Sequence, residues 1–135
     1  FDFWLAHLDE TPLFPYLLSY EGEQRSERVL RQIEADLPRY CVEQNDLLVP
    51  LRYLNTHPGE SDAIICAALE SIFDLPRGIA CGIIDDWGQE FITPAIRRSL
   101  IKARQLSNNE VVTARIDCLL AGKHFDIGKF LNKRK

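Results

Sequence analysis

The sequence predicts an all-α protein of short antiparallel helices, packed as a compact bundle or a short solenoid. Helix-start and helix-stop signals recur along the chain, and sustained alternation of β-branched residues, the mark of strands, is missing. Prolines also divide the chain at regular points. They are Pro50, Pro58, Pro76 and Pro94, the last three equally spaced, and each is expected to end one helix or open the next.

Three helices are expected within the stretch 1–75. Thr11 followed by Pro12 indicates a helix start, because the hydroxyl can cap a first turn in which proline loses no hydrogen bond. A second helix is expected over 23–36, and a third over 62–75. The apolar stripe of the third, which is wide enough to pack on two neighbours, consists of Ile64, Ile65, Ala68, Leu69, Ile72 and Phe73.

Two further helices have recognisable caps. Thr93 followed by Pro94 predicts a helix start for the same reason as at Thr11. Ser107 with Glu110 three positions later resembles a capping box, and Gly122 suits a left-handed C-terminal cap. These signals predict a helix over 108–121.

Part of the chain resembles HEAT-type helical repeats, in which pairs of antiparallel helices stack into a curved solenoid. The stretch 47–54 is similar to the first helix of a unit, and the second helix would begin near Ile64. The stretch 94–100 is similar to the second helix of a following unit, at a spacing somewhat shorter than the family's usual period. The turn over 58–63 lacks the family's usual residues, and Arg104 occupies an expected apolar position. The resemblance implies a non-enzymatic scaffold with a concave binding surface.

The chain has the size of one domain, and we expect a single helical domain over residues 1–135. Its charge is segregated along the sequence. Residues 1–96 contain 6 basic and 17 acidic residues, a net charge of −11, whereas residues 97–135 contain 10 basic and 3 acidic residues, a net charge of +7. This asymmetry indicates an electrostatic partner surface, or two parts that complement each other within the fold.

The expected environment is the cytoplasm, with the nucleus as the alternative. The four cysteines lie in apolar stretches without any C-x-x-C pair, which favours buried thiols in a reducing compartment. The apolar runs are too short to cross a bilayer. No membrane partner is therefore expected.

The sequence does not point to an enzyme, a metal site or a cofactor. None of the three histidines has the spacing of paired metal ligands. His57 lies near Ser61 and Asp62, but groups this close in sequence rarely form a triad, and the latter two suit a helix start. No glycine-rich nucleotide-binding loop occurs either.

An unusual acidic segment is the first candidate binding site. Asp85 and Asp86 precede Trp87, and Glu90 follows shortly after. Adjacent helical carboxylates point about 100° apart and are poorly placed to share a proton. The functional hypothesis is an acidic rim around an exposed Trp87 that anchors a basic protein. The structural alternative is surface acids with Trp87 packed inward.

The second candidate site is basic. Arg97, Arg98 and Lys102 fall on the outer face of the expected helix that starts at Pro94, and Arg115 lies on the next helix. Together they resemble a helix-turn-helix arrangement that lacks the usual turn glycine. The sequence thus predicts a protein-binding module, of the adaptor or inhibitor (immunity-type) class, that uses an acidic helical surface. The alternative is a nucleic-acid-binding protein that uses the basic face of 97–135.

Overall fold

The computed structural model describes residues 22–123 and 125–133, and this part of the chain confirms the all-α fold class. It contains seven α-helices, two short 3-10 helices and no strand. The helix start expected at Thr11 and Pro12 lies outside the described residues. The helices are α3 (Gly22–Ala35), α4 (Leu48–Asn55), α5 (Asp62–Leu69), α6 (Asp74–Trp87), α7 (Pro94–Leu106), α8 (Glu110–Leu120) and α9 (Ile127–Lys133), and the 3-10 helices are η1 (Leu37–Tyr40) and η2 (Gln89–Phe91).

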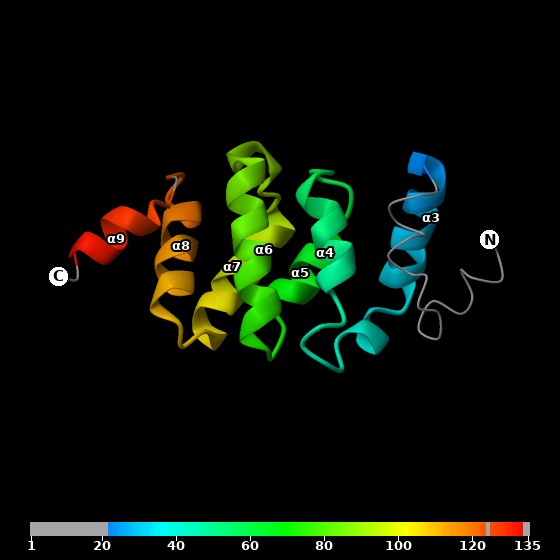
Figure 1. Cartoon of the computed structure of the whole chain (residues 1–135), viewed down its shortest axis with the longest axis horizontal. Helices are drawn as coiled ribbons and strands as arrows, with labels where there is room; N and C mark the ends of the chain where they lie inside the picture. Colours follow the sequence, from blue (N-terminus) through cyan, green and yellow to red (C-terminus); the bar gives the residue numbers. More distant parts are fainter. Residues whose placement is uncertain (1–21, 124, 134–135) are drawn as a thin grey trace.

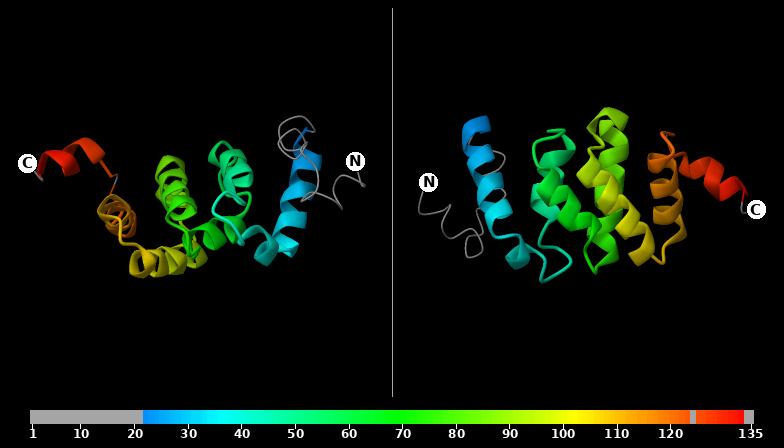
Figure 2. Two further views of the ribbon diagram at one scale, coloured as in Figure 1. Left: turned by 60° about the horizontal axis from the view of Figure 1, so that its bottom comes forward. Right: turned by 180° about the vertical axis from the view of Figure 1, so that it is seen from behind.

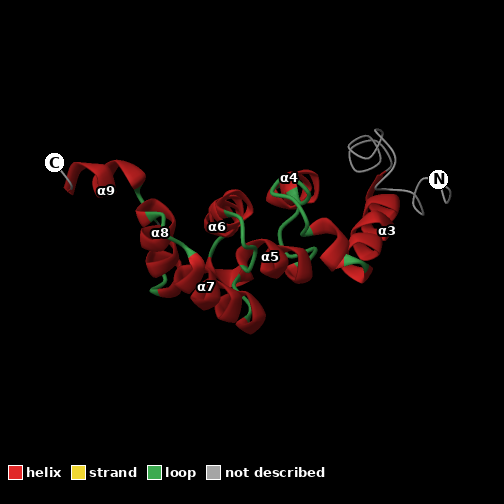
Figure 3. Cartoon of the chain, turned by 90° about the horizontal axis from the view of Figure 1, so that it is seen from below, coloured by secondary structure: helices red, strands yellow, loops and turns green. Residues whose placement is uncertain are grey.

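The helices form an elongated array in which spatial order follows sequence order. From α3 to α9 they succeed one another along the longest axis of the molecule (Figure 1). Helices α4 and α6 pack side by side, as do α5 and α7, and α8 packs on both α6 and α7. The two further views in Figure 2 and the view from below in Figure 3 show α5 and α7 on one side of the array and α4 and α6 on the other.

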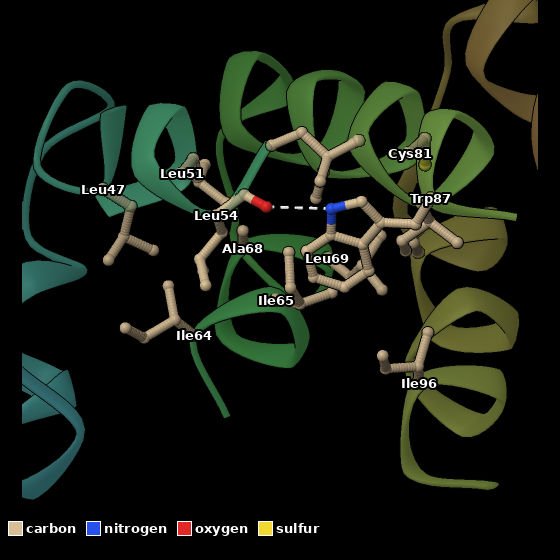
Figure 4. Close-up of a cluster of buried hydrophobic side chains, with 14 of the residues drawn as sticks. Leu47, Leu51, Leu54, Ile64, Ile65, Ala68, Leu69, Cys81, Trp87 and Ile96 are labelled. Atoms are coloured by element: carbon tan, nitrogen blue, oxygen red, sulfur yellow. Dashed lines mark hydrogen bonds between the residues drawn. The ribbon is translucent and has the colours of Figure 1, made fainter. Parts of the chain in front are cut away.

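The centre of the array is a cluster of buried aliphatic side chains around one indole ring (Figure 4). Trp87, at the C-terminal end of α6, is only 6% exposed, and its Nε1–H donates a hydrogen bond of 2.8 Å to the backbone carbonyl of Leu54 in α4. The indole thereby joins two helices through residues that lie 33 positions apart in the sequence. Side chains packed in the same cluster include Leu51, Leu54, Ile64, Ile65, Ala68, Leu69, Cys81 and Ile96.

The helix expected over 62–75 is two elements, so that part of the prediction was wrong. α5 ends at Leu69 and α6 begins at Asp74, which leaves Ile72 80% exposed instead of buried in the stripe. Ser71 stabilises the turn: its hydroxyl accepts a hydrogen bond of 3.0 Å from the N–H of Phe73. Its carbonyl accepts one of 2.5 Å from the buried guanidinium of Arg77.

Three of the four prolines open helices, in agreement with the role expected for them. Pro94 is the first residue of α7, and the hydroxyl of Thr93 accepts a hydrogen bond of 3.2 Å from the N–H of Ile96. Pro50 and Pro76 lie in the first turns of α4 and α6, where a helical N–H has no intrahelical partner.

The cap of α8 differs from the expected capping box. Asn109, not Ser107, is the N-cap, and its side-chain oxygen accepts hydrogen bonds from the N–H groups of Val111 (2.9 Å) and Val112 (3.1 Å). The expected C-terminal cap is confirmed. Gly122 has a φ of 75°, and the N–H of Lys123 reaches the carbonyl of Cys118 at 2.8 Å, the pattern of a Schellman motif.

The corrected cap leads to a first testable prediction. Replacing Asn109 by Ala should lower the free energy of unfolding by about 1 kcal/mol, because two N–H groups lose their acceptor. Ser107→Ala is the matched control and should cause a smaller loss, since its hydroxyl accepts only the N–H of Asn109. Urea denaturation of both variants measures the difference. A larger loss of stability for Ser107→Ala would indicate that Ser107, as first expected, caps α8.

A second prediction concerns the central indole. Trp87→Phe should lower the free energy of unfolding by about 1–3 kcal/mol, because it removes the hydrogen bond to Leu54 and leaves space in the core. Ile72→Ala, at an exposed apolar position, should change stability by no more than about 0.5 kcal/mol. Equal effects of the two substitutions in denaturant titrations would contradict the assigned role of Trp87.

Candidate protein-binding surface

The acidic candidate residues lie where α6 ends and turns into η2. Asp85 is partly exposed, while Asp86 and Glu90 are exposed. The helix ends because Gly88 adopts φ 100° and ψ 166°, a backbone conformation that residues with a Cβ rarely adopt. The three carboxylates therefore lie where α6 passes into η2. We refer to Asp85, Asp86 and Glu90 as the acidic turn.

Trp87 is not part of the exposed surface, so the version of the hypothesis with an exposed indole was wrong. The ring is buried between α4, α5 and α6 (Figure 4), and the edge of Phe91 packs on it at a centroid distance of 5.9 Å. The structural alternative, in which Trp87 packs inward beside surface acids, describes the observed arrangement. Trp87 therefore positions the acidic turn and cannot contact a partner directly.

The electrostatics of the acidic turn are locally unfavourable. A helix C-terminus carries a partial negative charge and favours cations, yet the last turn of α6 contains Asp85 and Asp86 and no basic residue. Among the described residues, Asp86 and Glu90 have no ion pair or hydrogen bond through their side chains. Carboxylates that lower the stability of their own helix are a typical feature of a binding surface.

A neighbouring turn extends this surface. Gly59, between α4 and α5, lies against the ring of Phe91, which would be only 3.2 Å from a Cβ at position 59. Glu60 follows Gly59, and its Oε2 is buried without a hydrogen-bond partner among the described residues. The sequence analysis did not single out Phe91 or Glu60, because the approach of Gly59 to Phe91 depends on the packing of α4 beside α6.

The groups around His57 are occupied by structural contacts. The imidazole stacks on Tyr53 with centroids 3.9 Å apart, and its Nδ1 lies 2.8 Å from the backbone carbonyl of Tyr53. The hydroxyl of Ser61 donates to Glu34 at 2.8 Å and accepts the N–H of Ile64 at 3.2 Å. Ser61 is thus the N-cap of α5, the helix start that the sequence indicated.

The four cysteines are free thiols in the structure. Cys81 is buried, and burial raises the pKa of its thiol to about 12. Burial also raises the pKa of Cys41 and Cys66, although these two residues and Cys118 are partly exposed rather than fully buried as expected. Since the thiolate is the nucleophile, none of the three shifted thiols is prepared for catalysis.

The basic candidate residues differ in their exposure and contacts. On α7, Arg97, Arg98 and Lys102 are all exposed. Arg97 donates to the carbonyl of Leu120 at 3.3 Å, and Lys102 pairs with Glu70 at 3.0 Å. Arg115 packs beneath Phe125, with its guanidinium carbon 5.2 Å from the ring centroid. Arg104, expected at an apolar position, is exposed and forms an ion pair with Asp117.

Glu70 connects the C-terminal end of α5 with α7. Its carboxylate accepts hydrogen bonds from the hydroxyl of Ser99 at 2.8 Å and from Nζ of Lys102 at 3.0 Å. These two contacts, that of Ser99 first, lower the pKa of Glu70 below its usual value. The sequence analysis did not find this network, because its partners lie 29 and 32 positions from Glu70.

In the described part of the chain, no group of three or more His, Cys, Asp or Glu side chains is arranged to hold a metal ion. No described helix has both the length and the apolarity needed to span a membrane. An open pocket of about 420 Å³ beside α8 is lined by Ser107, Asn108, Glu110, Thr113, Ala114, Asp117 and Phe130. One of its carboxylates, that of Asp117, is already paired with Arg104.

Comparison with known proteins adds no relative to this description. No protein-family model matches the chain, and no curated protein or solved structure is significantly similar to it. Functional inference therefore depends on the geometry and charge of the chain itself.

The Glu70 network gives a third prediction. Because the pKa of Glu70 is lowered on folding, its contribution to stability is present above the pKa of the unfolded chain and is lost as the pH falls through the folded value. In an NMR titration of the Glu70 carboxyl, Ser99→Ala should raise the midpoint more than Lys102→Met. A larger effect of Lys102→Met would contradict the leading role of the Ser99 hydroxyl.

Proposed function

We propose that this chain is a non-enzymatic protein-binding module, of the adaptor or inhibitor (immunity-type) class, whose acidic turn binds a basic protein. The observation that carries the proposal is the placement of Asp85 and Asp86 in the last turn of α6, with Glu90 just beyond it in η2. The dipole of α6 opposes the first two carboxylates, and the last turn of this helix contains no basic residue. A cationic partner would relieve this repulsion.

The shape of the molecule supports the same proposal. Because spatial order follows sequence order along the array (Figure 1), the acidic part of the chain and the basic part occupy different ends. Described residues 22–96 contain 6 basic and 13 acidic residues, whereas 97–133 contain 8 basic and 3 acidic residues. Such a charge distribution speeds and orients encounters with a charged protein.

The catalytic alternative has less support. The hydroxyl of Ser61 caps α5, and the imidazole of His57 is held against Tyr53, so neither is directed at a shared reaction centre. The carboxylates of Asp85 and Asp86 lie on a surface turn instead of facing each other across a cleft. A reducing compartment, the cytoplasm or the nucleus, suits the four free thiols.

Nucleic-acid binding by Arg97, Arg98, Lys102 and Arg115 is the second candidate. The net positive charge of the α7–α9 region favours it. The contacts of Arg97 with Leu120 and of Lys102 with Glu70 weaken it, because these two side chains would have to leave their present partners to reach phosphates together.

The first experiment is affinity capture from native lysate at low and at moderately high salt, with nuclease added to a parallel sample. We expect a protein partner that survives nuclease and is lost at the higher salt concentration. Recovery that depends on intact nucleic acid would instead favour the basic region.

The fourth prediction concerns the association rate with the captured partner. Raising the ionic strength should lower this rate by about tenfold or more, because screening weakens long-range attraction. The double variant Asp86→Asn with Glu90→Gln should bind more slowly than the wild type at low salt. The control, Glu27→Gln with Glu43→Gln, removes two exposed charges elsewhere and should have little effect. An association rate insensitive to salt, or equal losses in both double variants, would contradict the proposal.

A further inference from the structure

Arg115 of α8 lies close to the backbone of α6 at Gly82. A Cβ at position 82 would be 3.3 Å from its Nη1, so a larger residue there would press on the guanidinium. One turn earlier, Val112 of α8 faces Gly78, where a Cβ would make ordinary van der Waals contact with its Cγ2 at 3.6 Å. The closest approach of α8 to these two glycines is therefore made by Arg115.

The guanidinium group of Arg115 contains one buried N–H donor that has no acceptor among the described residues. This donor is Nε–H, and the described residues supply Arg115 with no ion pair. Arg77 is also buried, and its Nε likewise lacks a hydrogen bond, but its terminal nitrogens contact the carbonyl of Ser71 and the carboxylate of Asp74. A buried donor without an acceptor costs about 1–3 kcal/mol, and more when it is charged, so the site of Arg115 is incomplete.

Phe125 covers this guanidinium. The ring is 6% exposed and lies 5.2 Å from the guanidinium carbon of Arg115, and it packs on Phe130 of α9 at a centroid distance of 5.8 Å. Asp126 accepts the N–H groups of Lys129 and Phe130, each at 3.1 Å. Phe125 is therefore linked to a seven-residue helix that projects from the end of the array (Figures 1 and 2).

We propose that Arg115 is the anchor of a phosphate-binding site, and that Phe125 is its displaceable cover. A helix as short as α9 has little stability of its own, so its displacement requires the loss of few interactions. A phosphate group would then accept hydrogen bonds from Nε and Nη of Arg115, the fork for which guanidinium groups are suited. Lys123, exposed at the end of α8, adds positive charge near the position that Phe125 vacates.

Phosphate is favoured over a carboxylate by charge. A phosphate dianion gains more from a region with 8 basic and 3 acidic residues between 97 and 133 than a carboxylate does. The phosphate could be free or part of a nucleic acid. Both sources have the same chemistry, and the experiment separates them.

The fifth prediction uses the Nε–H of Arg115 as the reporter in a two-dimensional NMR spectrum of the whole chain. Titration with inorganic phosphate should shift this signal saturably and should also shift the ring protons of Phe125. Chloride at matched ionic strength and sodium acetate are the controls. A parallel titration with a short single-stranded oligonucleotide shows whether a nucleic-acid phosphate occupies the same site.

Variants distinguish a binding site from a packing contact. Phe125→Ala should tighten phosphate binding by about tenfold, because the binding-competent state no longer has to displace the ring. A purely structural role for Phe125 predicts only lower stability. Arg115→Lys keeps the positive charge but lacks Nε–H, and should abolish saturable binding, which isothermal titration calorimetry measures. Circular dichroism and thermal unfolding verify that both variants are folded.

Saturable shifts with phosphate, or with phosphate and the oligonucleotide, together with tighter binding by Phe125→Ala, support the proposal. The proposal is overturned if phosphate acts no differently from chloride, if acetate binds equally well, or if Phe125→Ala fails to tighten binding. The acidic turn takes no part in this site, so either result leaves the fourth prediction intact.

Discussion

The hydrogen bond between the indole of Trp87 and the carbonyl of Leu54 holds together the part of the molecule on which the remaining structure is built. A tryptophan at the end of a helix buries a large apolar surface, and its polar N–H needs an acceptor once it leaves water. Here the acceptor is a backbone carbonyl of α4. The contact fixes the distance between α4 and α6, and α5 and α7 pack across them.

This constraint also explains the position of the acidic turn. The ring of Trp87 is buried in the core at the last residue of α6. The backbone turns directly after it, and Gly88 has the unusual dihedral angles that this turn requires. The neighbouring carboxylates are then directed to solvent. The burial of Trp87 and the exposure of Asp86 beside it are two consequences of the same helix end. The negative charge there is the reason to propose a basic partner.

Three arginines of this structure differ in how far they are buried and in which groups they contact. Arg77 is almost completely buried, at 3% exposure, but it satisfies the turn between α5 and α6 through Ser71 and Asp74. Arg104 remains in solvent with Asp117. Arg115 lies between these extremes, under an aromatic ring and beside a glycine, without an oxygen partner among the described residues. That difference is why we assign a ligand to Arg115 and not to the others.

Local signals in the sequence determined the helical class, the start of α7 at Thr93 and Pro94, and the end of α8 at Gly122, because caps and prolines act through neighbouring backbone groups. They missed the break between α5 and α6, a turn that is stabilised by the contacts of Ser71 with Phe73 and with buried Arg77. They also assigned the cap of α8 to Ser107 instead of Asn109. The sequence identified the acidic residues but not whether Trp87 faced solvent. Only the tertiary structure decided that point, together with the contacts of Glu70 and the covering of Arg115. Each depends on residues that lie far apart in the sequence, which no local pattern brings together.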